Sequence, residues 1–329
     1  MKVFSVILAI VGSVIGSGFI SGKEVAVFFA RFGYWSLPCL FFVFFLFWGV
    51  FYLILAKSDA IIEKTKNSIL FFLFNLILSI IFSSAMFAGV DNLLSFNSFY
   101  LNFLIFIAVM LVCLLILKKG ANILNKVNLV FVPIMIILFL LLLSSKSSFT
   151  LPLYESEISG WSFFYSIMYV ALNTSNGCVM IASLGQGLTN RQKARVGFIS
   201  ALVLMLILMF VNIILLQHPM ALSLEMPLLM LFDGYQGLAM KIIIAVGCST
   251  TLFSLIYTSS FLVRGLCNNE FLNFVISIIL PSLLSLLGFG FIVTYLYPMA
   301  SIMGIFVLFD LIFLKNSDKK IKLKPRKGL

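Results

Sequence analysis

Long apolar runs separated by short polar breaks recur along the whole chain. A helix needs roughly 20 apolar residues to cross the hydrocarbon core of a bilayer, and these runs have about that length. The runs predict ten transmembrane helices, at approximately residues 3–32, 35–56, 69–90, 98–117, 121–143, 160–185, 196–217, 237–261, 270–288 and 291–314. The pattern therefore predicts an all-α integral membrane protein.

Composition strengthens this prediction. Of the 329 residues, 62% are hydrophobic and 10% are charged, and the mean hydropathy is +1.19, far from the values of soluble domains. Little sequence remains between the runs, so we expect the function to lie inside the helix bundle. The net charge of +11 does not indicate nucleic-acid binding, because Lys and Arg are dispersed through short loops.

The distribution of Lys and Arg predicts the orientation, because cytoplasmic loops are enriched in both. With a cytoplasmic N-terminus, the outer segments contain only Arg31, Lys146 and Lys241, and Lys23 lies within the first span. The rest of the 22 basic residues are then cytoplasmic. We therefore expect a multi-pass protein of the inner (cytoplasmic) membrane with both termini cytoplasmic. The basic tail, 315–329, is a topology signal or contacts anionic lipid.

The residues that carry most enzyme chemistry are sparse. The five cysteines form no CxxC pair, and His218, the only histidine, has no second metal ligand nearby in sequence. The chain contains no HExxH or GxSxG motif. We therefore expect no enzyme and no cofactor, with Na+ as a candidate coupling ion. The partners expected are a small solute and the lipid bilayer.

Two of the predicted spans are interrupted by small and polar residues: the first, at GSVIGSGFISGKE (12–24), and the sixth, at LNTSNGC (172–178). Small residues can also serve close helix packing, which alone would explain the first motif. The two breaks lie five spans apart, an odd number, so the halves would have opposite topology. This predicts two inverted five-helix repeats, residues 1–145 and 146–314, with helices 1 and 6 interrupted.

Further polar residues lie in the first and eighth spans. The cluster GCSTT (247–251) offers hydroxyl and carbonyl oxygens that suit Na+, although proton coupling stays open. Lys23 and Glu24 follow the first break, and ionisable residues inside a membrane are functional candidates. We expect them to gate access or to carry a coupling proton; a structural ion pair with other partners is the alternative. Asp91 and Asp310 are expected at the interfaces.

Two motifs, VGSVIGSGFISGKEV at the start and GFGFIVTYLYPMASIMG (288–304) near the end, resemble the bacterial YkvI-type membrane proteins. That family is related to the amino acid–polyamine–organocation superfamily, which has the LeuT-like fold. The resemblance runs over essentially the whole chain. It implies a transporter without naming the cargo.

The resemblance also implies a set of site residues. A sodium ion would lie between the first and eighth helices, bound by the carbonyls of Gly12, Ile15 and Val246 and the hydroxyls of Ser249 and Thr250. A substrate carboxylate would meet amides around Gly16, Ser17 and Gly18, opposite Asn173, Thr174, Ser175, Asn176 and Gly177. The departures from sodium symporters are Lys23 and Glu24 beside the break and only ten spans.

The sequence thus predicts a secondary active transporter that works by alternating access and is coupled to Na+ or H+. The expected solute is an amino acid or a related zwitterion or carboxylate. The alternative is a permease-like receptor that senses a ligand without net transport.

Overall fold

The computed structural model describes residues 2–93, 121–146, 159–266, 269, 272–273 and 275–314. Within these residues every regular element is helical, which confirms the predicted all-α class. The predicted fourth span, 98–117, and the basic tail, 315–329, lie outside the described residues.

The first half of the chain begins with three short helices in place of one. The helices of this half are α1 (Lys2–Val14), α2 (Ser17–Ile20), α3 (Lys23–Phe28), α4 (Ser36–Ala56), α5 (Ser58–Asn67), α6 (Ile69–Leu93) and α8 (Ala121–Ser144). A 3-10 turn, Ala30–Trp35, joins α3 to α4.

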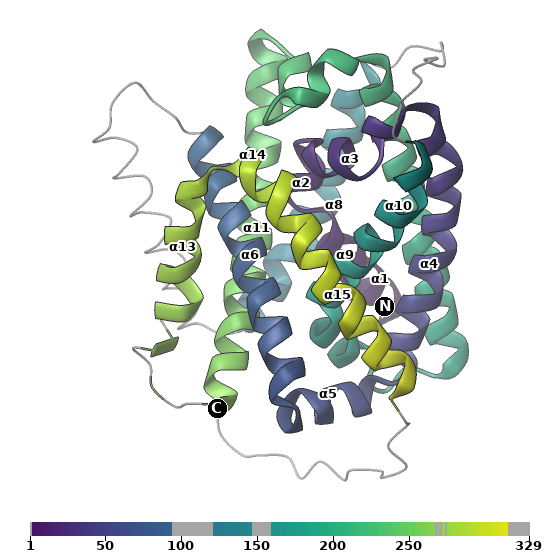
Figure 1. Ribbon diagram of the computed structural model, residues 1–329, viewed down its shortest axis with the longest axis vertical. Helices are drawn as coiled ribbons and strands as arrows, with labels where there is room; N and C mark the ends of the chain where they lie inside the picture. Colours follow the sequence, from purple (N-terminus) through teal and green to yellow (C-terminus); the bar gives the residue numbers. More distant parts are fainter. Residues whose placement is uncertain are drawn as a thin grey trace.

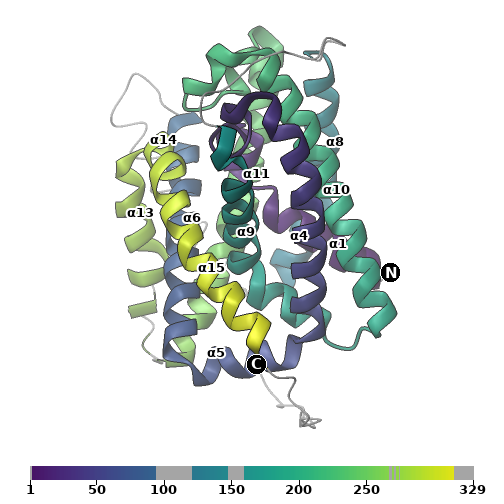
Figure 2. The ribbon, with the colours of Figure 1, turned by 45° about the vertical axis from the view of Figure 1, so that its right-hand side comes forward.

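The second half begins with two long helices. Its main helices are α9 (Ser162–Gly185), α10 (Asn190–Gln217), α11 (Gly234–Leu266), α13 (Leu280–Leu284), α14 (Phe289–Phe291) and α15 (Tyr297–Phe313). π-helical turns, Val275–Ile279 and Ile292–Leu296, precede α13 and α15. Figures 1 and 2 show α9 inside the bundle, with α15 crossing it diagonally.

Six helical segments of the described chain are long and apolar enough to cross a membrane: Ala30–Ala56, Ile69–Leu93, Ser162–Gly185, Asn190–Gln217, Gly234–Arg264 and Phe289–Phe313. Shorter apolar helices occupy Val3–Val14, Phe131–Ser144 and Val275–Leu287. These nine segments fall on the predicted spans other than the fourth.

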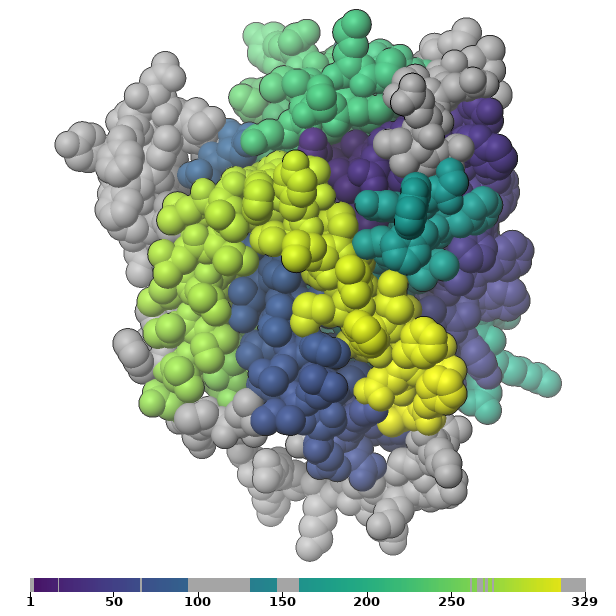
Figure 3. Space-filling view, viewed as in Figure 1, coloured from purple at the N-terminus to yellow at the C-terminus, as the bar shows by residue number. Residues whose placement is uncertain are grey.

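Apolar side chains cover the outside of the bundle, whereas many hydroxyl and amide side chains are buried. Phe41, Phe45 and Leu141 are more than half exposed, while Ser83, Thr174 and others lie fully inside. A soluble protein has the opposite preference. This distribution is typical of a helix bundle that is surrounded by lipid. Figure 3 shows α6 at the surface between α13 and α15.

Glycine allows the closest helix contacts. A Cβ at Gly12 of α1 would lie 3.0 Å from Val132 of α8, and one at Gly304 of α15 would lie 2.7 Å from the carbonyl oxygen of Ala171 in α9. Backbones approach this closely only where a side chain is missing. These glycines bring α1 close to α8 and α15 close to α9.

Short segments lie across the two ends of the bundle (Figure 1). Helix α5 crosses one end and packs against α9 and α6. At the other end, the segment 219–231, which contains the 3-10 turns Pro219–Ser223 and Leu229–Leu231, packs against α10, α11 and α3. The polar cluster described below lies between these two ends.

Candidate functional site

The first predicted span is interrupted twice, which confirms its predicted break. After α1 ends, the Gly16 N–H donates to the Val14 carbonyl (3.0 Å), whereas a continuous helix would bond it to Gly12. The chain turns again between α2 and α3, where Gly22 has a φ of 82°. A left-handed φ favours glycine, because it has no Cβ to collide with the backbone.

The predicted break in the sixth span is wrong, because α9 is a continuous helix through 172–178. The side chains there bond to their own helix: Asn173 Nδ2 donates to the Tyr169 carbonyl (3.1 Å), and Thr174 Oγ1 donates to Val170 (2.6 Å). Such bonds satisfy polar side chains without unwinding the backbone. Ser175 instead donates to the Gly304 carbonyl of α15 (3.0 Å).

Helices α6, α9 and α11 surround the break after α1. A Cβ at Gly16 would lie 3.5 Å from Thr251 of α11 and 3.7 Å from Met86 of α6. A Cβ at Gly177 of α9 would lie 3.4 Å from the Ser13 hydroxyl. The structure therefore brings together Gly16 and Gly177 of the predicted substrate set around one helix end.

The predicted ion ligands on α11 have partners inside that helix. Ser249 Oγ donates to the Ala245 carbonyl (2.8 Å), and Thr250 Oγ1 donates to the Val246 carbonyl (3.0 Å). The face of α11 toward α2 includes Gly247, where a Cβ would lie 2.6 Å from Ile20. At about 100° per residue, Ser249 lies about 200° from Gly247, whereas Thr251 shares its face.

Glu24 on α3 is 1% exposed and lies against Gly18 of α2. A Cβ at Gly18 would overlap the Glu24 carboxyl group, whose Cδ lies 2.7 Å from that position. Glu24 Oε2 has no hydrogen-bond partner in the described structure. A buried polar atom without a partner is uncommon and costs about 1–3 kcal/mol.

Two tyrosines of other helices lie near α3, the helix of Glu24: the Tyr169 ring contacts Phe28, one turn after Glu24, and the π-helical turn before Tyr297 packs against α3. Tyr169 of α9 and Tyr297 of α15 are fully buried, and each hydroxyl lacks a hydrogen-bond partner among the described residues. Both hydroxyls are close enough to Glu24 to interact with it electrostatically. We call Glu24, Tyr169 and Tyr297 the Glu24 cluster; it joins three elements that are far apart in sequence.

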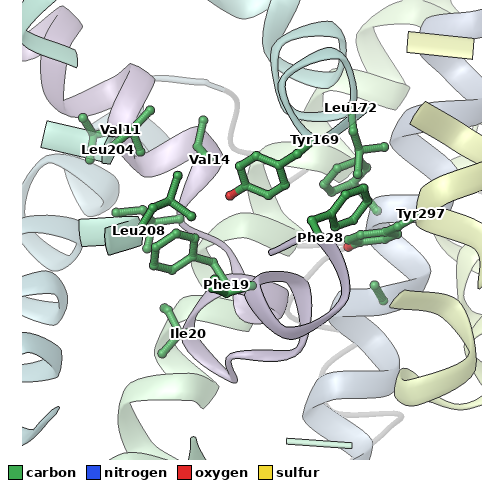
Figure 4. Packing of buried hydrophobic residues seen from close by; sticks show 14 of the residues in the cluster. Val11, Val14, Phe19, Ile20, Phe28, Tyr169, Leu172, Leu204, Leu208 and Tyr297 are labelled. Carbon is green, nitrogen blue, oxygen red and sulfur yellow. The ribbon is translucent and has the colours of Figure 1, made fainter. Parts of the chain in front are cut away.

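Aromatic contacts fix the two phenol rings. The Tyr169 ring contacts Phe28 and Phe29, with centroids 5.5 and 4.9 Å apart, and the Tyr297 ring stacks on Phe82 at 4.7 Å. Figure 4 shows Tyr169 beside Phe28, with its oxygen directed away from the Phe28 ring. Packing therefore holds the two hydroxyls in place, without a hydrogen bond from any residue that the structure describes.

Lys23 does not pair with Glu24. Its Nζ donates to the Leu224 carbonyl in the 219–231 segment (2.7 Å), and the Leu228 N–H of that segment donates to the Ser21 carbonyl (2.9 Å). Glu225 adds an electrostatic attraction for Lys23. Lys23 therefore fastens the 219–231 segment onto the turn between α2 and α3, while Glu24 points inward.

The opposite end is fastened through α5. Lys57 Nζ donates to the last carbonyls of α15, Leu311 (2.9 Å) and Ile312 (2.8 Å). Lys64 forms an ion pair with Asp310. Gln186, which follows α9, donates to Asp59 Oδ1 (2.8 Å). These bonds tie the ends of α9 and α15 to the link between α4 and α6.

Other polar residues near the break complete the site. Asn176 Oδ1 on α9 and Ser83 Oγ on α6 are buried without a hydrogen-bond partner in the described structure. Asn176 was among the predicted residues, but Tyr169 and Tyr297 were not. A tyrosine within a largely apolar run was one signal that could have identified them, and Tyr297 also lies in the motif 288–304.

A scan against protein-family models and a search of curated proteins found no match to this chain.

Proposed function

We propose that the protein is a secondary active transporter of a small solute, coupled to Na+ or H+ through alternating access. The observation that carries this proposal is the group of buried, unpartnered polar atoms beside the interrupted first span, at the centre of an apolar helix bundle. Each such atom is costly unless a ligand, an ion or water bonds to it. A solute and its coupling ion would supply those bonds.

The packing of the helices supports two inverted repeats. When each helix is replaced by the one five spans later, its contacts recur: α1–α8 becomes α9–α15, α4–α9 becomes α10–α1, and α8–α11 becomes α15–α6. The pairs α1–α9, α4–α10 and α6–α11 map onto themselves. Two inverted repeats related by a pseudo-twofold axis in the membrane plane would give this relation.

The linking segments follow the same relation. Helix α5 joins the second span to the third and packs against α9, while the 219–231 segment joins the seventh to the eighth and packs against α3. In the proposed orientation, the first closes the cytoplasmic end and the second the outer end. Alternating access then requires the bonds of Lys57 and those of Lys23 to break in turn.

We further propose that the chain belongs with the YkvI-type proteins and shares the LeuT-like arrangement of ten spans in the bacterial inner membrane. The motif 11–25, which carries that resemblance, contains the interruption and Glu24. The solute would be an amino acid or a related zwitterion or carboxylate, bound between Gly16–Gly18 and the polar face of α9. Glu24 is the candidate for the coupling proton.

Thermal unfolding of the purified protein tests this proposal, because a bound ligand stabilises by mass action. Amino acids and small carboxylates are tested in sodium and in potassium buffer, and each compound that stabilises is then tested for uptake into proteoliposomes. Concentrative uptake driven by a sodium or proton gradient is expected. Binding without uptake would indicate the sensing permease, and no response to any compound in either buffer would refute the proposal.

A further inference from the structure

The Glu24 carboxyl lies in the interior without a positive partner in the described part of the chain. Lys23 bonds outward to Leu224, and the Arg31 guanidinium stacks 4.1 Å from the centre of the Tyr165 ring. The Glu225 carboxylate accepts a hydrogen bond from Asn92. A carboxylate in such surroundings is stable only with a bound proton or a cation beside it.

The Glu24 cluster has the composition of a cation site. Glu24 Oε2 and the two tyrosine hydroxyls provide oxygen acceptors from α3, α9 and α15, and these three atoms are buried without a hydrogen-bond partner in the described structure. A primary ammonium group has three N–H donors and no acceptor, which matches three unpartnered oxygens. These unpartnered oxygens therefore favour a ligand with several hydrogen-bond donors over an anion.

The surroundings favour an organic cation over a bare metal ion. The rings of Phe28, Phe29 and Phe82 pack directly on the two tyrosines. Aromatic faces attract ammonium groups through their quadrupole, and they also accommodate the apolar part of an amine.

We propose that Glu24, Tyr169 and Tyr297 bind the primary ammonium group of the solute. This inference rests on the proposed transport function and narrows its substrate class: the amine is required, and the carboxylate is not. The charge of the ammonium group replaces the missing partner of Glu24, and each tyrosine accepts one of its N–H bonds.

Three compounds of matched shape test the inference: leucine, isoamylamine, which lacks the carboxylate, and isocaproate, which lacks the amine. Each is titrated into the purified full-length protein while thermal unfolding and binding heat are followed. We expect leucine and isoamylamine to stabilise the protein and isocaproate to have no effect. Stabilisation by isocaproate and not by isoamylamine would overturn the inference and leave the transport proposal standing.

Variants locate the site. Glu24→Gln should weaken isoamylamine binding by a factor of about 100 or more, since the charge pair is lost. Tyr169→Phe and Tyr297→Phe should each weaken it about tenfold, the effect of one hydrogen bond to a charged group. Glu63→Gln on α5, where the carboxylate is exposed, is the matched control and should leave binding unchanged.

Unaltered amine binding in all three cluster variants would overturn the inference, and so would a lack of response to any amine. Stabilisation by sodium alone that Glu24→Gln abolishes, without an amine response, would assign the cluster to the ion instead. If Glu24→Gln does not fold, the two tyrosine variants decide, because each removes only one oxygen from a packed ring. Failure of uptake with intact amine binding would contradict transport but not the ammonium site.

Discussion

The carboxyl group of Glu24 packs against the bare Cα of Gly18, where any other residue would place its Cβ. This contact joins α2 to α3 and fixes the position of the carboxyl group. Glycine is therefore required at position 18 because the Glu24 carboxyl group occupies the place of a Cβ. The backbone conformation of Gly18 does not itself require glycine, since its φ is not positive.

Gly18→Ala should displace the Glu24 side chain and destabilise the protein. Overpacking of a tight contact costs about 1–3 kcal/mol, which thermal unfolding of the purified protein measures. Gly49→Ala is the control, because a Cβ there would meet nothing within 4 Å. Equal stability of the two variants would show that Glu24 can rearrange freely.

Glu24→Gln should flatten the pH dependence of uptake if Glu24 carries the coupling proton. Glutamine preserves the shape of the side chain but cannot gain or lose a proton in the working range. Uptake into proteoliposomes at a series of external pH values gives the profile, with Glu63→Gln as the control. A profile identical to that of the native protein would remove Glu24 from the coupling mechanism.

Lys23→Met should loosen the 219–231 segment while leaving the apolar part of the side chain in place. The lost bond to the Leu224 carbonyl is worth roughly 1.5–3 kcal/mol, because one partner is charged. Hydrogen exchange of the Leu228 amide, which bonds to Ser21, should become faster. The control is Lys241→Met at an exposed position of α11, and unchanged exchange in Lys23→Met would contradict the fastening role.

If a sodium ion binds at the first break, substitutions on the two faces of α11 should have different effects. Thr251 faces Gly16 there, so Thr251→Ala should abolish any dependence of ligand binding on sodium. Ser249→Ala should leave that dependence intact, because its hydroxyl lies on another face and bonds to Ala245. Binding measured in sodium and potassium buffers distinguishes the two, and loss in Ser249→Ala alone would support the ion site that the resemblance implies.

Much of the helical framework could be predicted from the sequence. Apolar runs of sufficient length have few alternatives to a helix in lipid, because every backbone polar group must find its partner within the segment. The first interruption was predictable for a related reason, since Gly12, Gly16, Gly18 and Gly22 together weaken the helix locally.

The second interruption shows where local sequence is ambiguous. Asn173, Thr174 and Ser175 have the composition of a break, but the same side chains can bond to the preceding turn or to α15 and leave the helix whole. Both outcomes satisfy the polar groups. The neighbouring carbonyl of Gly304, which belongs to a distant segment, contributed to the outcome.

The sequence by itself determined the helical class, the apolar spans and the position of the first break, because these depend on residues close together in the chain. Only the tertiary structure decided that Glu24, Tyr169 and Tyr297 lie near one another, that Lys23 turns toward Leu224, and that Thr251 rather than Ser249 faces the break. Each depends on the rotation and approach of helices packed from distant segments. Those are set by side-chain shape at the contacts, such as the absence of a side chain at Gly304, and no periodicity in the sequence encodes them.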